Sequence, residues 1–191
     1  MKIAILKERR ANETRVAGSP ETVKKFVALG VDVCVEKGAG TTASMSDAAV
    51  LEAGATIADD VASALDLADL VLKVQRPMIE GEKLNELANF KRGQVLVCQM
   101  SALSEPPFVA ALAASGVTGF ALELMPRIAR AQSMDILSSQ SNLAGYKAVL
   151  DAAAEFGRAF PMMMTAAGTI PPARVLVMGV GVAGLQAIAT A

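Results

Sequence analysis

A polar stretch, residues 125–146, carries the side chains of this chain that are best suited to chemistry. The candidates are Arg127, Gln132, Asp135 and Ser138. Arginine and serine can donate hydrogen bonds to an amide oxygen, aspartate can accept one from an amide nitrogen, and glutamine can do both. These side chains are therefore suited to binding a planar carboxamide, such as that of a nicotinamide ring.

The same stretch also has a purely structural interpretation. Asp135 and Ser138 are three residues apart, so they share a face if a helix begins near them. Ser133 and Asp135 can then act as helix caps, where an acid is also favoured by the helix dipole, and Arg127 can be a surface charge. Spacing alone leaves the structural and the binding interpretation open.

A second stretch has the GxGxxG pattern of dinucleotide-binding turns. It consists of Gly179, Val180, Gly181, Val182, Ala183 and Gly184. A strand is predicted before it at 173–178 and a helix after it at 185–189. In such turns the first glycine permits a tight turn, the second lets a pyrophosphate approach, and the third lets the helix pack on the strand. We therefore expect these six residues to hold the pyrophosphate at the helix N-terminus.

The domain that this turn opens is expected to be incomplete. The acidic residue that holds the ribose should follow about 20 positions later, which is beyond Ala191. We predict a complete domain at 1–135, a connecting helix and loop at 136–165, and the start of a dinucleotide-binding domain at 166–191. The isolated chain is expected to be inactive.

The residues before the polar stretch alternate between apolar runs and helical patterns. Strands are predicted at 3–6, 31–35, 55–58, 69–74, 94–98 and 119–124. Helices are predicted to begin at Ser19, Ser46 and Ser104, with others at Glu80–Asn89 and 135–156, and a loop at 161–172. Continuous apolar strands that alternate with helices favour an α/β fold with a parallel, Rossmann-like sheet covered on both faces. Ligands bind at the carboxyl ends of such strands, and the polar stretch follows directly on the last of them.

Composition excludes several classes of protein. The net charge is −1, so there is no electrostatic case for nucleic acid. The chain has no histidine, the commonest acid–base catalyst and metal ligand, and we predict no metal site. Cys34 and Cys98 lie in apolar runs and are predicted to be buried and reduced. No apolar run reaches the ~18 residues of a membrane span and no signal peptide is recognisable, so we expect a cytoplasmic protein.

Five motifs occur in a characteristic order along the chain. They are KERR (7–10) with ETRV (13–16), KVQRP (73–77), residues 127–146, MMMTAAGT (162–169) and the glycine turn. In this order they resemble the N-terminal portion of the α subunit, the NAD(H)-binding component, of proton-translocating NAD(P) transhydrogenases. The run RAQSMDILSSQSNLAGY (130–146) within the third motif is highly specific, whereas the glycine turn alone is not.

This resemblance implies direct hydride transfer between NAD(H) and NADP(H), coupled to proton translocation in the full complex. Arg127, Asp135 and Ser138 would orient the nicotinamide ring, and Gln132 would reach toward NADP(H) on a partner domain; Arg127, Gln132 and Asp135 are the expected catalytic residues. The implied partners are the NADP(H)-binding domain, the membrane domain or β subunit, which would hold the chain at the inner membrane, and a second copy in a homodimer. An apolar content of 53% without glycine fits such partner surfaces.

Alanine dehydrogenases share this fold and are the alternative. They carry a substrate-binding lysine where this chain has Gln75 and a catalytic histidine near the position of Ser101, while Arg15 is common to both groups. Oxidising an amino acid needs a base, whereas hydride transfer between two nicotinamides needs positioning and exclusion of water. The residues present therefore favour the transhydrogenase. A third hypothesis is that the chain by itself is a non-catalytic fragment or association module.

Overall fold

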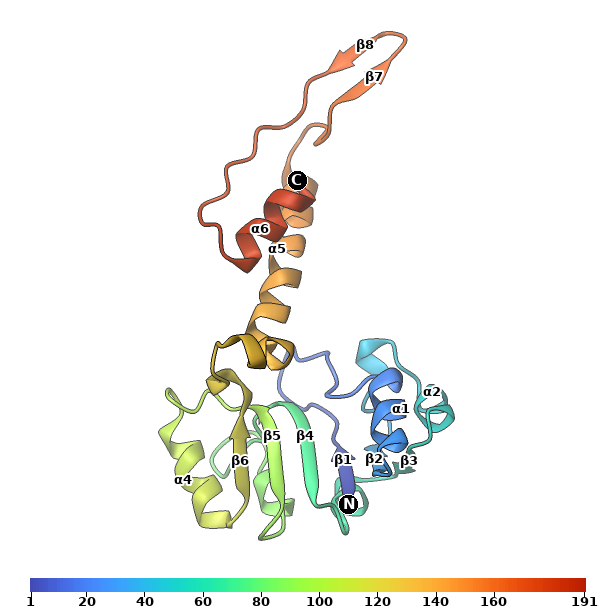
Figure 1. Ribbon diagram of the computed structural model, residues 1–191, viewed down its shortest axis with the longest axis vertical. Coiled ribbons are helices and arrows are strands. Elements are labelled where there is room, and N and C mark those ends of the chain that lie inside the picture. Colours follow the sequence, from blue (N-terminus) through green and yellow to red (C-terminus); the bar gives the residue numbers. More distant parts are fainter. The chain divides into compact units, whose positions relative to one another are not determined.

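The structure is a computed structural model that describes residues 1–191 (Figure 1). The chain forms two compact units, unit 1 (Met1–Leu124) and unit 2 (Met125–Ala191). The domain division expected at 135 and 165 stays a prediction. Neither unit has a helix with the length and apolar content needed to cross a lipid bilayer.

Unit 1 contains a single sheet of parallel strands (Figure 1). Its strands are β1 (Lys2–Ile5), β2 (Asp32–Glu36), β3 (Thr56–Ala58), β4 (Leu70–Gln75), β5 (Val95–Gln99) and β6 (Thr118–Ala121). Its helices are α1 (Pro20–Ala28), α2 (Asp47–Glu52), α3 (Val61–Leu65) and α4 (Pro106–Ser115), with 3-10 turns η1 (Thr41–Ala43), η2 (Leu87–Asn89) and η3 (Leu122–Leu124). The order β3-β2-β1-β4-β5-β6 is that of doubly wound sheets, which places the topological switch point between β1 and β4.

Apolar side chains of unit 1 alternate between the two faces of this sheet. Ile3 and Ile5 of β1 lie in one buried cluster with Val23 of α1. Ala4, between them, lies in the other cluster with Phe108 of α4. Both faces are therefore covered, which explains the continuously apolar strands and confirms the predicted fold class.

Both cysteines lie inside this core. Cys34 on β2 and Cys98 on β5 are buried and free. Burial raises the pKa of the Cys98 thiol, which disfavours the reactive thiolate. The prediction that both are buried, unpaired thiols is confirmed.

The helix predicted at Glu80–Asn89 is wrong. The segment is a loop that ends in the single turn η2, and Gly81 within it has a φ of +90°. The side chain of Glu82 binds the guanidinium groups of Arg10 and Arg76, at 3.1 and 2.8 Å, and accepts a backbone hydrogen bond in its own loop. Tertiary ion pairs thus override the helical pattern of this segment.

The strand predicted at 119–124 is only partly formed. β6 ends at Ala121, and residues 122–124 form the 3-10 turn η3. The carboxylate of Glu123 accepts hydrogen bonds from the backbone N–H groups of Met100 (3.0 Å) and Ala102 (2.9 Å) in the loop after β5. This contact with the neighbouring loop ends the strand.

Unit 2 contains the polar stretch and the glycine turn. Its elements are η4 (Ala129–Met134), α5 (Ile136–Glu155), β7 (Met163–Thr165), β8 (Gly168–Ile170) and α6 (Val182–Thr190). Helices α5 and α6 confirm the two helices predicted in this region. β7 and β8 form an antiparallel hairpin inside the segment predicted as a loop. Its tight turn is supported by the hydroxyl of Thr165, which accepts a hydrogen bond from the Ala167 N–H at 3.2 Å.

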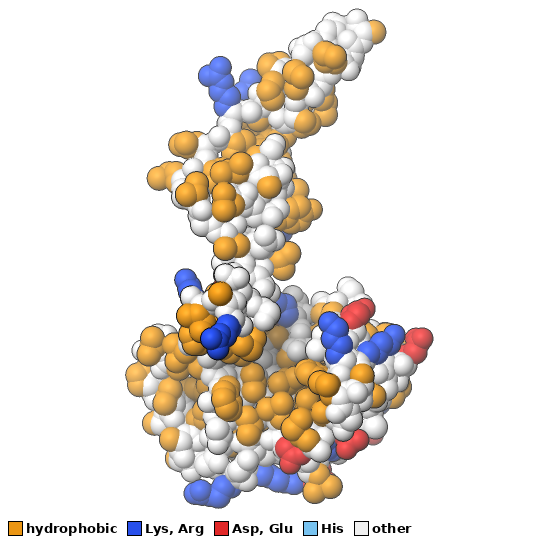
Figure 2. Space-filling view, in the orientation of Figure 1, with side chains coloured by type: hydrophobic (Ala, Val, Ile, Leu, Met, Phe, Trp, Pro, Cys, Tyr) orange, Lys and Arg blue, Asp and Glu red, His pale blue; other side chains and the backbone are white.

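The strand predicted at 173–178 is also wrong. No strand of unit 2 pairs with this segment, and a strand requires a neighbour to satisfy its backbone hydrogen bonds. Its apolar side chains are accordingly exposed, with Leu176 at 86% and Met178 at 92%. Figure 2 shows hydrophobic side chains on much of the visible surface of this unit.

Candidate functional site

Each of the three positions of the turn requires or tolerates glycine for a different structural reason. Gly179 has a φ of +102°, a region that favours glycine. A Cβ on Gly184 would lie 2.0 Å from the carbonyl oxygen of Gly179, so only glycine lets α6 start so close to the turn. A Cβ on Gly181 would meet nothing within 4 Å, so the backbone there is open. This is the division of roles expected for a turn that binds a pyrophosphate.

Helix α6 begins without a side-chain cap. Its N-cap is Gly181, and its first turn has no acidic residue. The first N–H groups of a helix have no partner within the helix and carry partial positive charge. The start of α6 therefore favours an anionic group.

A cavity of about 390 Å³ lies against this turn within unit 2. Its lining residues are Arg127, Leu137, Ser138, Ser141, Met178, Gly179, Gly181, Val182, Ala183 and Gly184. The structure thus brings two predicted residues of the polar stretch together with the glycine turn. Val180 is not among the lining residues and is 71% exposed. The volume is within the ~300–1,000 Å³ of small-molecule sites.

Asp135 is the N-cap of α5 and orients Ser138. Its carboxylate accepts hydrogen bonds from the hydroxyl of Ser138 at 2.6 Å and from the Ser138 N–H at 3.0 Å. These bonds, the hydroxyl bond first, lower the pKa of Asp135 and keep the carboxylate ionised. The capping interpretation is therefore correct for Asp135, whereas Ser133 lies within η4 and does not cap α5.

Gln132 and Asp135 do not line the cavity. Gln132 is exposed in η4, where its carbonyl accepts the Asp135 N–H at 3.3 Å. Asp135 lies behind Ser138, which itself lines the cavity. The predicted residues therefore form three groups: Arg127 and Ser138 at the cavity, Asp135 supporting Ser138, and Gln132 on the surface.

Two residues near the cavity were not predicted. Ser141 lines it one turn after Ser138 on α5, and the i, i+3 spacing of the two serines is the signal that identifies it. Gly145 is buried in the middle of the same helix. Because glycine is a poor helix former, its presence there is a signal of close backbone packing.

The switch point of the unit 1 sheet is filled by charged side chains of the chain itself. Glu8 accepts hydrogen bonds from the backbone N–H groups of Val74 (2.6 Å) and Gln75 (3.4 Å). The ammonium group of Lys73 lies 3.4 Å from Glu8 and 3.2 Å from Glu86, and all three side chains are buried. Burial raises the pKa of Glu8, against the opposing effect of Lys73. Other doubly wound sheets bind ligands at this point. In this chain, the charged groups at the switch point bond to one another and to the backbone instead.

Arg15 and Gln75 of unit 1 are also bound by a carboxylate of the same unit, that of Glu13. Glu13 accepts hydrogen bonds from Arg15 Nε (2.8 Å) and Nη2 (2.7 Å) and from the amide of Gln75 (3.0 Å). The hydrogen bonds from Arg15 lower the pKa of Glu13 to about 2. The side chain of Gln75 thus binds Glu13.

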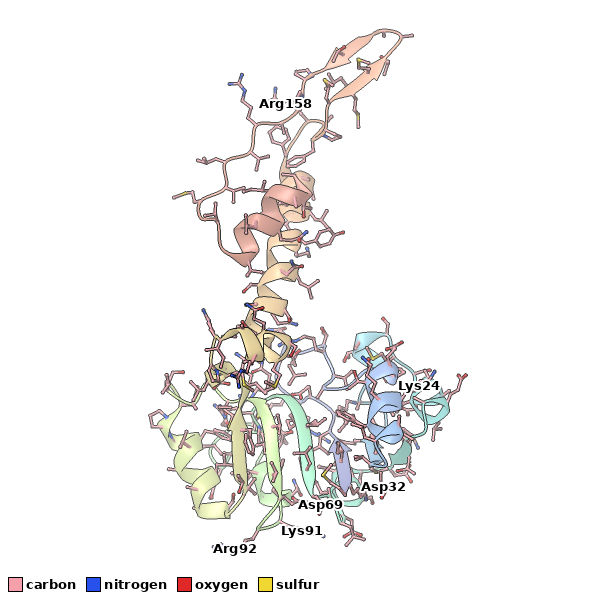
Figure 3. All side chains as sticks on the ribbon, in the orientation of Figure 1. Lys24, Asp32, Asp69, Lys91, Arg92 and Arg158 are labelled. Atoms are coloured by element: carbon pink, nitrogen blue, oxygen red, sulfur yellow. The ribbon has the colours of Figure 1, made fainter.

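A further cavity of unit 1, about 350 Å³, lies before the amino ends of β4 and β5. Asp69, Lys91 and Arg92 are among its lining residues, and Figure 3 shows them at this edge of the sheet. Because doubly wound sheets bind ligands at the carboxyl ends of their strands, we assign no function to it.

The fold and the turn define an α/β protein with a glycine turn of the dinucleotide-binding type. The chain belongs to the alanine dehydrogenase/PNT family. The N-terminal domain of this family matches residues 4–144, and its C-terminal domain matches residues 148–191. The family predicted from the five motifs is thereby confirmed.

Individual relatives agree with this assignment. An NAD(P) transhydrogenase subunit alpha chain of Rhodospirillum rubrum is 66% identical over 191 residues, which cover 100% of this chain and 50% of the relative. The crystal structure of a transhydrogenase from Sinorhizobium meliloti matches with a TM-score of 0.91 and 52% identity, over 100% of this chain and 55% of that one. An alanine dehydrogenase of Halomonas elongata is 35% identical over 190 residues, 98% of this chain and 49% of the relative. The chain spans about half the length of these relatives.

Proposed function

We propose that this chain belongs to the NAD(H)-binding component of a proton-translocating NAD(P) transhydrogenase. The observation that carries the proposal is the cavity in which Arg127 and Ser138 line the same space as the glycine turn. A nicotinamide dinucleotide has a pyrophosphate at its centre and a carboxamide at one end, and the cavity offers polar partners for both. The 66% identity to a transhydrogenase subunit supports this choice.

Each wall of the cavity has a role in this proposal. NAD(H), when bound, supplies the nicotinamide ring that gives or takes a hydride. The N–H groups at the start of α6 and the open backbone of Gly181 would hold the pyrophosphate. Arg127 would donate to the carboxamide oxygen, and Ser138, oriented by Asp135, would accept from the carboxamide nitrogen. Gln132, exposed in η4, would reach NADP(H) on the partner domain.

The proposed reaction requires little acid–base chemistry from the protein. A hydride that passes directly between two nicotinamide rings requires no base to remove a proton. The chain accordingly contains no histidine. Its side chains would orient the rings and exclude water from them.

The proposed partners follow from this role. They are an NADP(H)-binding domain and a membrane domain or β subunit, which would couple hydride transfer to proton translocation and keep this component at the inner membrane, and a second copy of the chain in a homodimer. The exposed apolar side chains of unit 2, such as Leu176, Leu185 and Ile188, support the need for further contacts.

An alanine dehydrogenase is the second candidate. The alanine dehydrogenase relative favours it, whereas Arg15, which both groups share, does not discriminate between the two candidates. The hydrogen bond from Gln75 to Glu13, at the position of a substrate-binding lysine, argues against it. Formation of NADH from NAD⁺ that depends on added alanine would establish this candidate in place of the transhydrogenase.

Substitution of Gln132 tests the proposed function. In the protein as it occurs in the cell, with its NADP(H)-binding partner, we expect Gln132→Asn to slow hydride transfer about tenfold or more, because the side chain is one carbon shorter. The Kd for NADH should stay within about twofold. Gln140→Asn, the same change at an exposed position of α5, is the control. Unchanged transfer in Gln132→Asn would remove Gln132 from the mechanism.

A further inference from the structure

Helices α5 and α6 approach each other backbone to backbone at Gly145. A Cβ at this position would lie 2.1 Å from the carbonyl oxygen of Ala183 and 3.0 Å from its Cα. These distances are far inside van der Waals contact, and the atoms concerned belong to the backbone. Even the methyl group of alanine therefore requires one helix to move away from the other.

This contact joins the two walls of the cavity. Ala183 and Gly184, in the first turn of α6, line one wall. Ser138 and Ser141, in the turns of α5 that precede Gly145, line the other. The first turn of α6 is thus held between the α5 backbone on one side and, through Gly184, the Gly179 carbonyl on the other.

Position 145 of α5 is glycine although glycine is a poor helix former. Gly145 lies within the 20-residue helix α5, where alanine is intrinsically more favourable than glycine. One turn earlier, the side-chain amide of Asn142 donates to Gln186 Oε1 of α6 at 3.0 Å. Close packing and a polar link therefore both hold α6 against α5 beside the cavity.

We propose that Gly145 is a positioning residue that sets the width of the cavity and thereby selects a whole dinucleotide over its fragments. The inference rests on the proposed function, in which NAD(H) contacts the serine wall and the glycine turn together. ADP contains only the groups that bind the turn. Moving the walls apart therefore weakens NADH binding and leaves ADP binding nearly unchanged.

The test is the ratio of two dissociation constants in the protein as it occurs in the cell. NADH and ADP are titrated separately into wild-type and Gly145→Ala protein. We expect the ratio of the Kd for NADH to the Kd for ADP to rise about tenfold in Gly145→Ala. Gly157→Ala is the matched control, because a Cβ at Gly157 would meet nothing within 4 Å, and it should leave the ratio unchanged. A general loss of structure would weaken the binding of both ligands alike. The ratio of the two dissociation constants therefore distinguishes it from a change in the width of the cavity.

A second variant covers the case in which Gly145→Ala does not fold. Asn142→Ala removes the hydrogen bond to Gln186 without adding volume, and we expect it to raise the same ratio about threefold. An unchanged ratio in the folded variants, with normal NADH binding by the wild-type protein, overturns the inference alone. Wild-type protein that binds no NADH overturns the proposed function and the inference with it.

Discussion

The hydroxyl of Ser138 donates its hydrogen to the carboxylate of Asp135 across 2.6 Å. Because an ionised carboxylate has no hydrogen to give, the direction of this bond is fixed. The serine oxygen can then serve a ligand at the cavity only as an acceptor. In the proposed function, Ser138 would therefore bind the nitrogen of the carboxamide, and Arg127 would bind its oxygen.

A ligand analogue tests this direction. In Ser138→Ala we expect the Kd for NADH to rise about tenfold, since one hydrogen bond to the amide nitrogen is lost. The Kd for an analogue with a methyl ketone in place of the carboxamide should change less than about twofold, because it has no N–H to donate. Both are measured by titration, with Ser139→Ala as the control. Equal losses for both ligands would mean that Ser138 donates to the carbonyl oxygen instead.

The second and third glycines of the turn should respond differently to alanine. In Gly181→Ala we expect loss of NADH affinity with an unchanged Tm, because the added methyl group has free space in the protein but meets the ligand. In Gly184→Ala we expect both affinity and Tm to fall, because the methyl group would collide with the Gly179 carbonyl. Calorimetry and NADH titration of both variants check this. A lowered Tm in Gly181→Ala would show that its role is structural.

Acid should destabilise unit 1 through Glu13. Its pKa is 4.5 in the unfolded chain and about 2 in the folded protein, so the carboxylate stabilises the fold above pH 4.5 and this contribution is lost as the pH falls toward 2. With a discount for the partly exposed Arg15, the loss is about 2 kcal/mol. Urea unfolding of wild-type and Glu13→Gln protein at several pH values measures it. A difference in stability between the two that does not shrink between pH 4.5 and 2 would contradict this linkage.

Lys73 should be essential for the stability of the switch point. Lys73→Met leaves the buried carboxylates of Glu8 and Glu86 without their shared cation, which should cost about 3–5 kcal/mol of unfolding free energy. Lys91→Met removes an exposed pair with Asp66 and should cost far less, because water screens such pairs. Urea unfolding of the two variants gives the comparison. Similar losses would show that the buried cluster is not a special source of stability.

Local patterns predicted the sheet because its strands are buried on both faces and its turns contain glycine. The same holds for the cap at Asp135, which depends only on neighbouring residues. The failures have a different origin. Residues 80–89 follow ion pairs to Arg10 and Arg76 that no local pattern contains, and residues 173–178 have a strand pattern but no neighbouring strand.

For the candidate site, sequence patterns identified two separate motifs, the polar stretch with Arg127 and Ser138 and the glycine turn. Their shared cavity depends on how α5 packs on α6, and that packing depends on the lack of a side chain at Gly145. A contact made possible by the absence of atoms leaves only a weak signal in a sequence.

Isotopic labelling tests whether the hydride passes directly from NADH to NADP⁺, as we propose. The protein, with its NADP(H)-binding partner, is given NADP⁺ and NADH that carries deuterium at C4 of the nicotinamide on the transferred face. Direct transfer should give NADPH that contains the deuterium, with none lost to water. NADPH without deuterium, or no NADPH at all together with NADH formation from NAD⁺ and alanine, would contradict it.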